Sequence, residues 1–182
     1  MNRSHPRFSA KVHLANVLGA FTVALGDELR DALRREAGGG VGVGRACPAA
    51  VLALDTWSGE SVEFLAGVGG LTHSGAVRLM DRLVANGLAV RQAGRDRRTV
   101  ALRLTARGRA VARHAREARA EVLLKLVDAM TATEQQVVGR ALDRLLRQGP
   151  RTRTQARHAC RLCDHSVCRG DDCPVGCSVR AS

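Results

Sequence analysis

Aromatic residues are almost missing from this 182-residue chain, which has three Phe, one Trp and no Tyr. A protein that stacks single-stranded bases on aromatic rings is therefore not expected. No run of about 18 apolar residues occurs either, so we expect no transmembrane helix. Hydrophobic residues still make up 45% of the chain, enough for a folded core of Leu, Val and Ala that favours helices.

Lysine and acidic residues are also scarce. Only Lys11 and Lys125 are lysines, so 27 of the 29 basic residues are Arg, against 17 acidic residues. The net charge of +12 indicates an anionic partner, although charge alone does not distinguish DNA, RNA and a membrane surface. Near the N-terminus, polar residues interrupt an apolar stretch at helical spacing. We therefore expect an amphipathic helix there instead of a signal peptide, and a cytoplasmic protein.

Apolar spacing, capping residues and glycines predict helices and two short strands. The expected helices span about 9–36, 48–56, two segments of 58–88 separated by a turn at 69–72, 105–130 and 131–147. The expected strands span 88–91 and 99–104 and are joined by a polar, basic loop. Thr72 and Thr105 are candidate N-caps, and Thr131 with Glu134 has the spacing of a capping box.

The order helix, helix, turn, helix, strand, basic loop, strand is that of a winged helix-turn-helix. A helix fits the major groove of DNA, where its N-terminal residues reach base edges. A basic two-stranded wing adds contacts to phosphates or to the minor groove. The sequence thus predicts a mostly α fold with a small β-wing that reads double-stranded DNA.

One segment resembles the MarR family of bacterial regulators; it spans 71–111 and reads LTHSGAVRLMDRLVANGLAVRQAGRDRRTVALRLTARGRAV. The resemblance extends over roughly 45–147 and does not include the cysteine-rich tail. It depends on the order and spacing of Arg78, Asp81 and Leu83, then Gly87-Leu88, then Asp96-Arg97-Arg98, and finally Leu104-Thr105 and Gly108. It implies a homodimeric, sequence-specific transcriptional regulator, a repressor that binds a pseudo-palindromic site.

The resemblance also implies a set of DNA-binding residues: Thr72, His73, Ser74, Gly75, Arg78, Arg95, Arg97 and Arg98. Thr72 would cap the recognition helix, whose exposed amides can bind a phosphate. Arg78 would reach a guanine edge or a phosphate, and Arg97 or Arg98 would enter the minor groove. His73 and Gly75 depart from the small polar or β-branched residues that are common there. Asp81 is expected to form a structural ion pair.

The same resemblance implies long N- and C-terminal dimerisation helices. The expected organisation is an N-terminal helix with a Gly-rich loop (1–44), a DNA-binding domain (45–110), C-terminal dimerisation helices (111–149), and a linker with a cysteine-rich tail (150–182). An apolar stripe suits the dimer interface, although packing within one chain would use the same residues: Val137, Val138, Ala141, Leu142, Leu145 and Leu146. Family members bind small anionic or phenolic ligands, so a small-molecule effector is a further expected partner.

Five of the six cysteines lie in the tail segment 160–177, which reads CRLCDHSVCRGDDCPVGC. The spacing predicts a tetrahedral zinc site that would fold the tail, with Cys160, Cys163, Cys168 and Cys173 as ligands. An iron–sulfur cluster is an open alternative, because four thiolates suit it equally and Cys173-Pro174 resembles the end of some cluster-binding runs. A reversible disulfide and an incidental set also stay open. Cys177, His158 and His165 are possible replacement ligands.

Three functions compete on this basis. The leading one is a regulator that acts on the bacterial nucleoid, responds to metal or redox state through the tail, and has no enzymatic activity. A non-specific architectural DNA-binding protein would instead show a steep salt dependence with little sequence preference. A thiol–disulfide oxidoreductase would use Cys160 and Cys163, but the βαβ context typical of that motif is missing.

Overall fold

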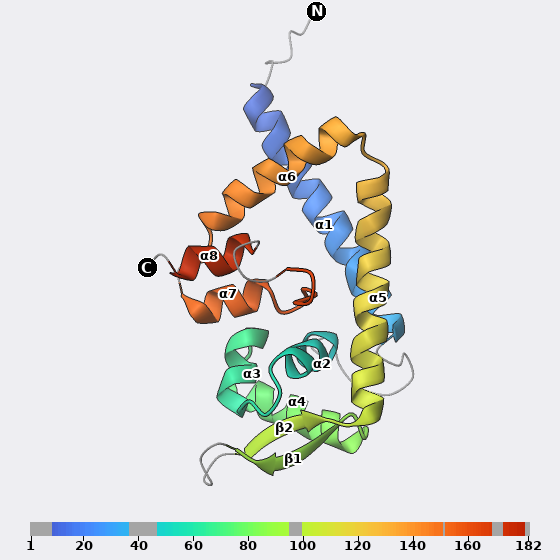
Figure 1. The fold of residues 1–182 in the computed structure, drawn as a ribbon, viewed down its shortest axis with the longest axis vertical. Helices are drawn as coiled ribbons and strands as arrows, with labels where there is room; N and C mark the ends of the chain where they lie inside the picture. Colours follow the sequence, from blue (N-terminus) through green and yellow to red (C-terminus); the bar gives the residue numbers. More distant parts are fainter. Residues whose placement is uncertain (1–8, 37–46, 95–99, 151, 169–172, 181–182) are drawn as a thin grey trace, which may run out of the picture.

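The computed structural model of the chain describes residues 9–36, 47–94, 100–150, 152–168 and 173–180 (Figure 1). Its elements are α1 (Ala10–Glu36), α2 (Cys47–Thr56), α3 (Val62–Gly69), α4 (His73–Ala85), β1 (Ala89–Ala93), β2 (Val100–Leu104), α5 (Ala106–Asp128), α6 (Ala132–Arg147), α7 (Arg153–Ala159) and α8 (Pro174–Arg180). The predicted fold class, mostly α with a small two-stranded wing, is confirmed.

The head consists of α2, α3, α4 and the two strands, packed against the beginning of α5. Its core is aliphatic, as the lack of aromatic residues predicts, and it centres on Leu52, Leu54, Leu65, Leu79, Leu83 and Leu102. Helix α4 directs Ala76, Leu79, Met80 and Leu83 into this core. The opposite face of α4 is thereby left to solvent.

The wing is a single antiparallel pair in which Ala89 lies opposite Leu104 and Ala93 lies opposite Val100. Strand β1 begins one residue later than the predicted 88–91 segment and ends two residues later, because its pairing with β2 continues through Gln92 and Ala93. An isolated bridge from Ser61 to Ala101 ties the beginning of α3 to the same sheet. The wing therefore has a fixed position relative to α3 and α4.

The junction between the wing and α5 depends on a close backbone approach. The Thr105 hydroxyl caps α5 by accepting from the Gly108 amide (3.0 Å) and donates to the Gly87 carbonyl (2.7 Å). A Cβ at Gly108 would stand only 2.0 Å from the carbonyl oxygen of Leu88. Gly87 itself has φ +65°, a left-handed conformation that glycine adopts without strain. The Gly87-Leu88 and Leu104-Thr105 segments are thus two sides of one contact.

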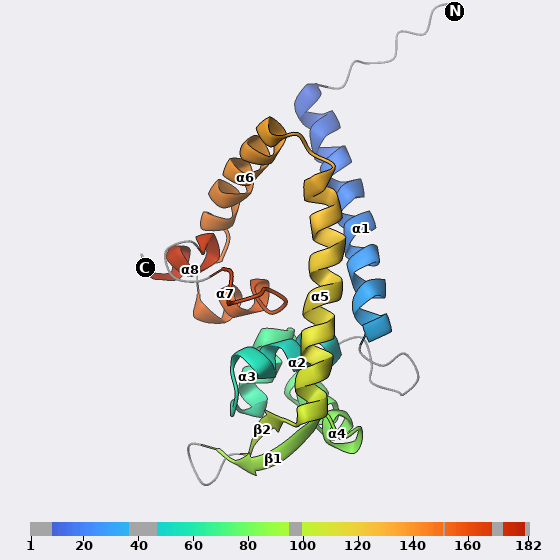
Figure 2. The same cartoon turned by 45° about the vertical axis from the view of Figure 1, so that its right-hand side comes forward.

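The arms, α1 and α6, extend away from the head (Figure 2). Helix α1 runs beside α5 and buries only Ala32 and Leu33, at its end near the head, and α6 buries no residue. The predicted capping box of Thr131 and Glu134 is present at the start of α6. Within the described ranges, no helix combines the length and apolar character that a membrane span requires.

The tail differs from the prediction. The segment expected to be a linker contains α7, which begins with a capping box formed by Thr152 and Gln155. Ala156, Cys160 and Val175 form a small buried cluster of their own, which the sequence-based view of a tail folded only by metal did not anticipate. Helix α7 contacts α3, and α8 contacts both α7 and α6, so the tail bridges the head and an arm.

Candidate nucleic-acid interface

Helix α4 presents its N-terminal turn to solvent. The Thr72 hydroxyl accepts a hydrogen bond from the Gly75 amide (3.1 Å), which confirms the predicted N-cap. Thr72, His73 and Ser74 are exposed, and Gly75 is half-buried beneath the cap. Arg78 is exposed further along the helix. Five of the predicted DNA-binding residues therefore occupy one exposed end of α4, where helix amides suit an anion.

Two acidic residues near α4 are already engaged by basic groups. Asp81 forms an ion pair with Arg91 of β1, which confirms its predicted structural role. Glu63 lies 3.6 Å from His73 Nδ1. Hydrogen bonds from its own amide and from Ser61, together with the charge of His73, hold the pKa of Glu63 below its ordinary value. The guanidinium of Arg78 has no partner among the described residues.

The wing-tip prediction concerns Arg95, Arg97 and Arg98, which lie outside the described residues. The strands that lead to them are described, and Arg91 and Arg103 are exposed on these strands. The loop between β1 and β2 therefore starts from the same sheet that packs against α4. The role of the three arginines stays a prediction.

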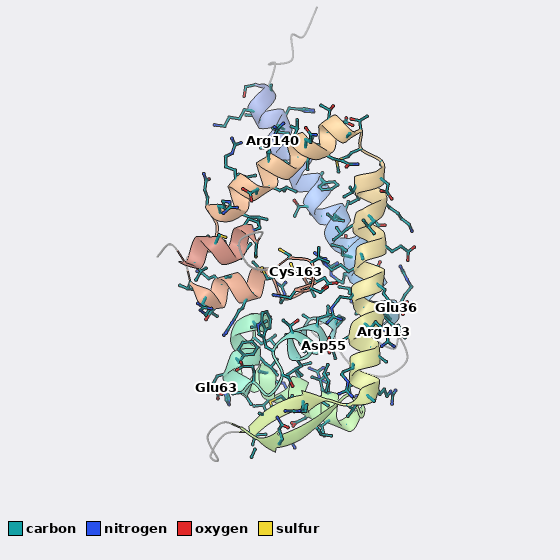
Figure 3. All side chains as sticks on the ribbon, in the orientation of Figure 1. Glu36, Asp55, Glu63, Arg113, Arg140 and Cys163 are labelled. Atoms are coloured by element: carbon teal, nitrogen blue, oxygen red, sulfur yellow. The ribbon has the colours of Figure 1, made fainter. Side chains whose placement is uncertain are left out.

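The cysteine residues of the tail lie close to the head. Cys160 is buried at the end of α7, and Cys163, Cys168, Cys173 and Cys177 are half-buried thiols. Figure 3 places Cys163 on the loop that follows α7, on the side that faces α5. Among the described residues, no three His, Cys, Asp or Glu side chains converge as the ligands of a single metal ion. The predicted set of four is nevertheless gathered in one part of the tail.

Cys160 and Cys163 form a hydrogen-bonded pair of thiols. The bond raises the pKa of Cys160, and burial and the neighbouring thiols act in the same direction. It lowers the pKa of Cys163 to about 6, where the positive charges of Arg119 and His165 also favour the thiolate. Cys163 is therefore the more easily ionised of the two.

The two candidate replacement ligands have other contacts. His158 Nδ1 lies 2.8 Å from the carbonyl oxygen of Val68 in α3. The ring of His165 packs edge-on against Trp57, with 5.0 Å between centroids, and its Nε2 lies 3.2 Å from the Cys160 carbonyl oxygen. Both histidines thus help to hold the tail in place.

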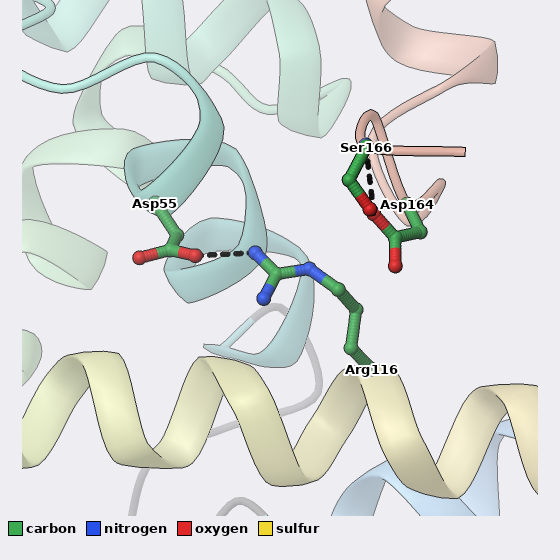
Figure 4. Close-up of polar contacts among 4 residues, drawn as sticks. All are labelled: Asp55, Arg116, Asp164 and Ser166. Atoms are coloured by element: carbon green, nitrogen blue, oxygen red, sulfur yellow. Dashed lines mark hydrogen bonds and ion pairs between the residues drawn. The ribbon is translucent and has the colours of Figure 1, made fainter. Parts of the chain in front are cut away.

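Sequence reasoning missed an ion pair that joins two helices near the tail. Arg116 of α5 pairs with Asp55 of α2, and both side chains are about a quarter exposed (Figure 4). Asp164 of the tail accepts hydrogen bonds from the amide (2.8 Å) and hydroxyl (2.6 Å) of Ser166, which lower its pKa with help from the charge of Arg116. Since the partners are 61 positions apart, no local spacing could have revealed the pair.

An apolar cavity of about 450 Å³ lies between α1, α2, α3 and the tail. Leu29, Leu33, Leu65 and Leu162 contribute apolar walls, and Arg30, Arg34 and Arg161 contribute cations. None of the aromatic residues Phe21, Trp57 and Phe64 lines it, and Phe21 is exposed on α1. Two of its lining residues, Arg161 and Leu162, stand between Cys160 and Cys163.

Comparison with known proteins gives a match in structure only. No family model and no curated protein matches the sequence. A MarR family protein from Bacillus stearothermophilus superposes with a TM-score of 0.65 at 23% identity, over 81% of this chain and 97% of that one. A MarR transcriptional regulator from Methanosarcina mazei gives 0.60 at 18%, over 74% and 96%. A MarR family protein from Mycobacterium tuberculosis, solved with salicylic acid, gives 0.50 at 25%, over 70% and 95%.

The chain has the winged-helix fold of MarR-family regulators. In chain order, α4 is the second helix of the helix-turn-helix, and β1 and β2 form the wing. Nearly the full length of each MarR-type neighbour is matched, whereas about a fifth to three tenths of the present chain lies outside the match. The chain therefore carries additional structure beyond the shared fold.

Proposed function

We propose that this chain is a sequence-specific, DNA-binding transcriptional regulator that acts as a repressor in the cytoplasm. The observation that carries the proposal is the exposed N-terminal turn of α4, with Thr72 as its cap and Arg78 on the same open face. Insertion of this helix into a major groove would bring the adjacent wing to the neighbouring phosphates. The net charge of +12 supports an anionic partner.

A homodimer is part of the proposal. The apolar stripe of α6 is largely uncovered by the described residues: Val137, Leu142 and Leu145 are each more than half exposed. The first part of α1 carries a similar exposed set, Val12, Leu14, Val17, Leu18 and Phe21. Contiguous apolar surfaces of this kind mark interaction sites, and the symmetric pairing of two copies would cover both. The dimer would then read two half-sites about 34–36 Å apart.

The binding test compares specific and random duplexes. We expect fluorescence anisotropy with a site selected from a random DNA library to give tight, sequence-dependent binding. Arg78→Ala should weaken binding to that site by about 5- to 150-fold, the range of one good base contact, and leave random-duplex binding almost unchanged. Arg140→Ala on α6, far from the wing in Figure 3, is the matched control and should change neither.

Two outcomes would argue against this assignment. Equal losses on both duplexes for Arg78→Ala would mean that Arg78 contacts only phosphates. Equal affinity of the unaltered chain for all sequences, with a steep salt dependence, would favour the architectural alternative. Variants of Arg97 and Arg98 should weaken binding to every sequence, because wing contacts are made mainly to the backbone and the minor groove.

A small aromatic or aliphatic carboxylate is the proposed effector. The apolar walls and arginine rim of the 450 Å³ cavity suit such a molecule, and one structural neighbour was solved with salicylic acid. Calorimetric titration with salicylate should show saturable binding that Arg161→Ala weakens and Arg140→Ala does not. The absence of saturable binding, or equal binding by both variants, would contradict the assignment.

A further inference from the structure

A second cavity, of about 350 Å³, lies where the tail meets the head. Cys160, Cys168 and Cys173 line it, and Cys163 adjoins them through its hydrogen bond to Cys160. Four sulfur donors around one space form the ligand set of a zinc ion or an iron–sulfur cluster.

The size of the cavity favours the cluster. A single zinc ion requires bonds of about 2.3 Å to four sulfurs, which brings the sulfurs together at one point. Cys160, Cys168 and Cys173 instead line a cavity of about 350 Å³, and among the described residues no three His, Cys, Asp or Glu side chains converge on one ion. Several iron and sulfide atoms would occupy such a space with cysteine ligands distributed around them.

The surroundings of the thiols also suit an anionic cluster. Arg153 and Arg157 line the same cavity, and the charge of Arg119 acts on Cys163. The amide of Gly176 donates a hydrogen bond to Cys173 Sγ (3.1 Å). Hydrogen bonds to cysteine sulfurs are among the features by which proteins tune such clusters. Charge and hydrogen bonding therefore agree with the size of the cavity.

The cavity is connected to the DNA-binding head by close contacts. Trp57, which directly follows α2, forms one wall of the cavity. It packs edge-on against Phe64 of α3, with 5.5 Å between the ring centroids. Helix α7 packs closely against α3. A Cβ added at Gly67 of α3 would stand only 3.0 Å from the methyl group of Thr154 in α7. His158 contacts the Val68 carbonyl oxygen at the end of α3, just before the turn into α4. A change in the tail would thus reach the helix that precedes the recognition helix.

We propose that Cys160, Cys163, Cys168 and Cys173 bind an iron–sulfur cluster, and that the bound cluster favours DNA binding by holding α7 against α3. Loss of the cluster would loosen the 160–168 loop and the start of α8. The packing of α7 against α3 would then weaken. The regulatory half of this proposal rests on the proposed DNA-binding function, whereas the cluster site does not.

Metal and sulfide analysis of the full chain, purified without oxygen, tests the site. We expect a brown protein that contains iron and inorganic sulfide in equal amounts. Cys160→Ser and Cys173→Ser should each lose at least about nine tenths of the iron, because each removes one of four ligands. Cys177→Ser, which alters a tail cysteine outside the cavity lining, is the matched control and should keep its colour. Circular dichroism verifies that each variant is folded.

Other results would overturn the site. A colourless chain with one zinc ion would mean that a single ion is bound, and a chain without metal even after incubation with ferrous iron and sulfide would mean that no centre forms. Equal iron loss in Cys177→Ser would contradict the choice of ligands. These results are independent of DNA binding, so they leave the proposed function intact.

DNA binding by the cluster-loaded and cluster-free forms tests the regulation. We expect the cluster-free form to bind the selected duplex about tenfold more weakly, within the usual range of coupling between two sites. His158→Ala, which removes the contact to Val68 without altering a cysteine, should keep the colour and reduce this difference. Equal affinities of the two forms would overturn the regulatory role. A coloured protein that binds no duplex in either form would contradict the proposed function and leave the site standing.

Discussion

In the head, Leu52, Leu83 and Leu102 are at most 1% exposed, whereas on the arm helix α6 no residue is buried and Leu142 and Leu145 are more than half exposed. Both regions have apolar residues at regular spacing, so the spacing alone does not tell which of them finds partners in the same chain. The head completes its own core around the sheet and α5. The arms present an apolar face that the described residues leave exposed, which is why we assign stability to the head and the proposed dimer assembly to the arms.

The largest effect should come from placing charge on the face of α6. We expect Leu142→Asp combined with Leu145→Asp to convert the proposed dimer to a monomer in light scattering, because buried unpaired carboxylates disrupt an apolar interface. Affinity for a two-half-site duplex should fall by about 100-fold or more, since one subunit makes half of the contacts.

The matched control for the interface is Arg140→Glu, which changes charge on the side of α6 away from the apolar stripe. It should leave the dimer intact. A chain that is monomeric without any substitution, or a double variant that stays dimeric, would show that the α6 face is not the interface.

The second effect concerns the stability of the head. Gly108→Ala would place a methyl group 2.0 Å from the Leu88 carbonyl oxygen, and we expect a loss of about 3 kcal/mol of unfolding free energy in urea. Gly19→Ala in α1 is the matched control, because nothing lies within 4 Å of its added Cβ. That variant should be neutral or stabilised by up to about 1 kcal/mol. Similar values for the two variants would mean that the junction is not tightly packed.

How far the sequence predicts this molecule differs between its parts. Thr72, Thr105 and Thr131 were recognisable as caps because their signal is local, and each of them caps a helix in the structure. The importance of Gly108 was visible only as part of a family pattern. Its physical cause, the carbonyl of Leu88 twenty residues earlier, required the fold.

In the tail, the start of α7 had a recognisable sequence signal, whereas the packing of α7 on α3 had none. Thr152 and Gln155 have the same capping-box spacing that identified α6, yet the surrounding Arg and Thr residues led to the prediction of a linker. The packing of α7 on α3 had no such local signal in the sequence. His158 and Val68 are 90 positions apart, and no periodicity connects them. The cysteine spacing predicted a shared site, but the cavity that Cys160, Cys168 and Cys173 line was visible only in the structure.

The smallest effect compares a cap in the head with a cap in the arm. Thr105→Ala removes a half-buried hydroxyl that bonds both Gly87 and Gly108, and we expect it to cost about 2 kcal/mol of unfolding free energy. Thr131→Ala removes an exposed cap and should cost distinctly less. Thr→Ser at either position keeps the hydroxyl and should restore most of the loss.

The pH dependence separates the two caps further. Hydrogen bonds from Thr131 hold the pKa of Glu134 below its ordinary value of 4.5. The stabilisation by this pair is therefore complete above pH 4.5 and is lost as the pH falls through the lower, folded-state value. The cost of Thr131→Ala, measured by urea unfolding, should shrink as the pH is lowered past 4.5, while that of Thr105→Ala should not, because its partners are a carbonyl and an amide that do not titrate. Parallel pH profiles would mean that the cap of α6 does not depend on the Glu134 carboxylate. The expected difference between a half-buried cap at Thr105 and an exposed cap at Thr131 would then be wrong.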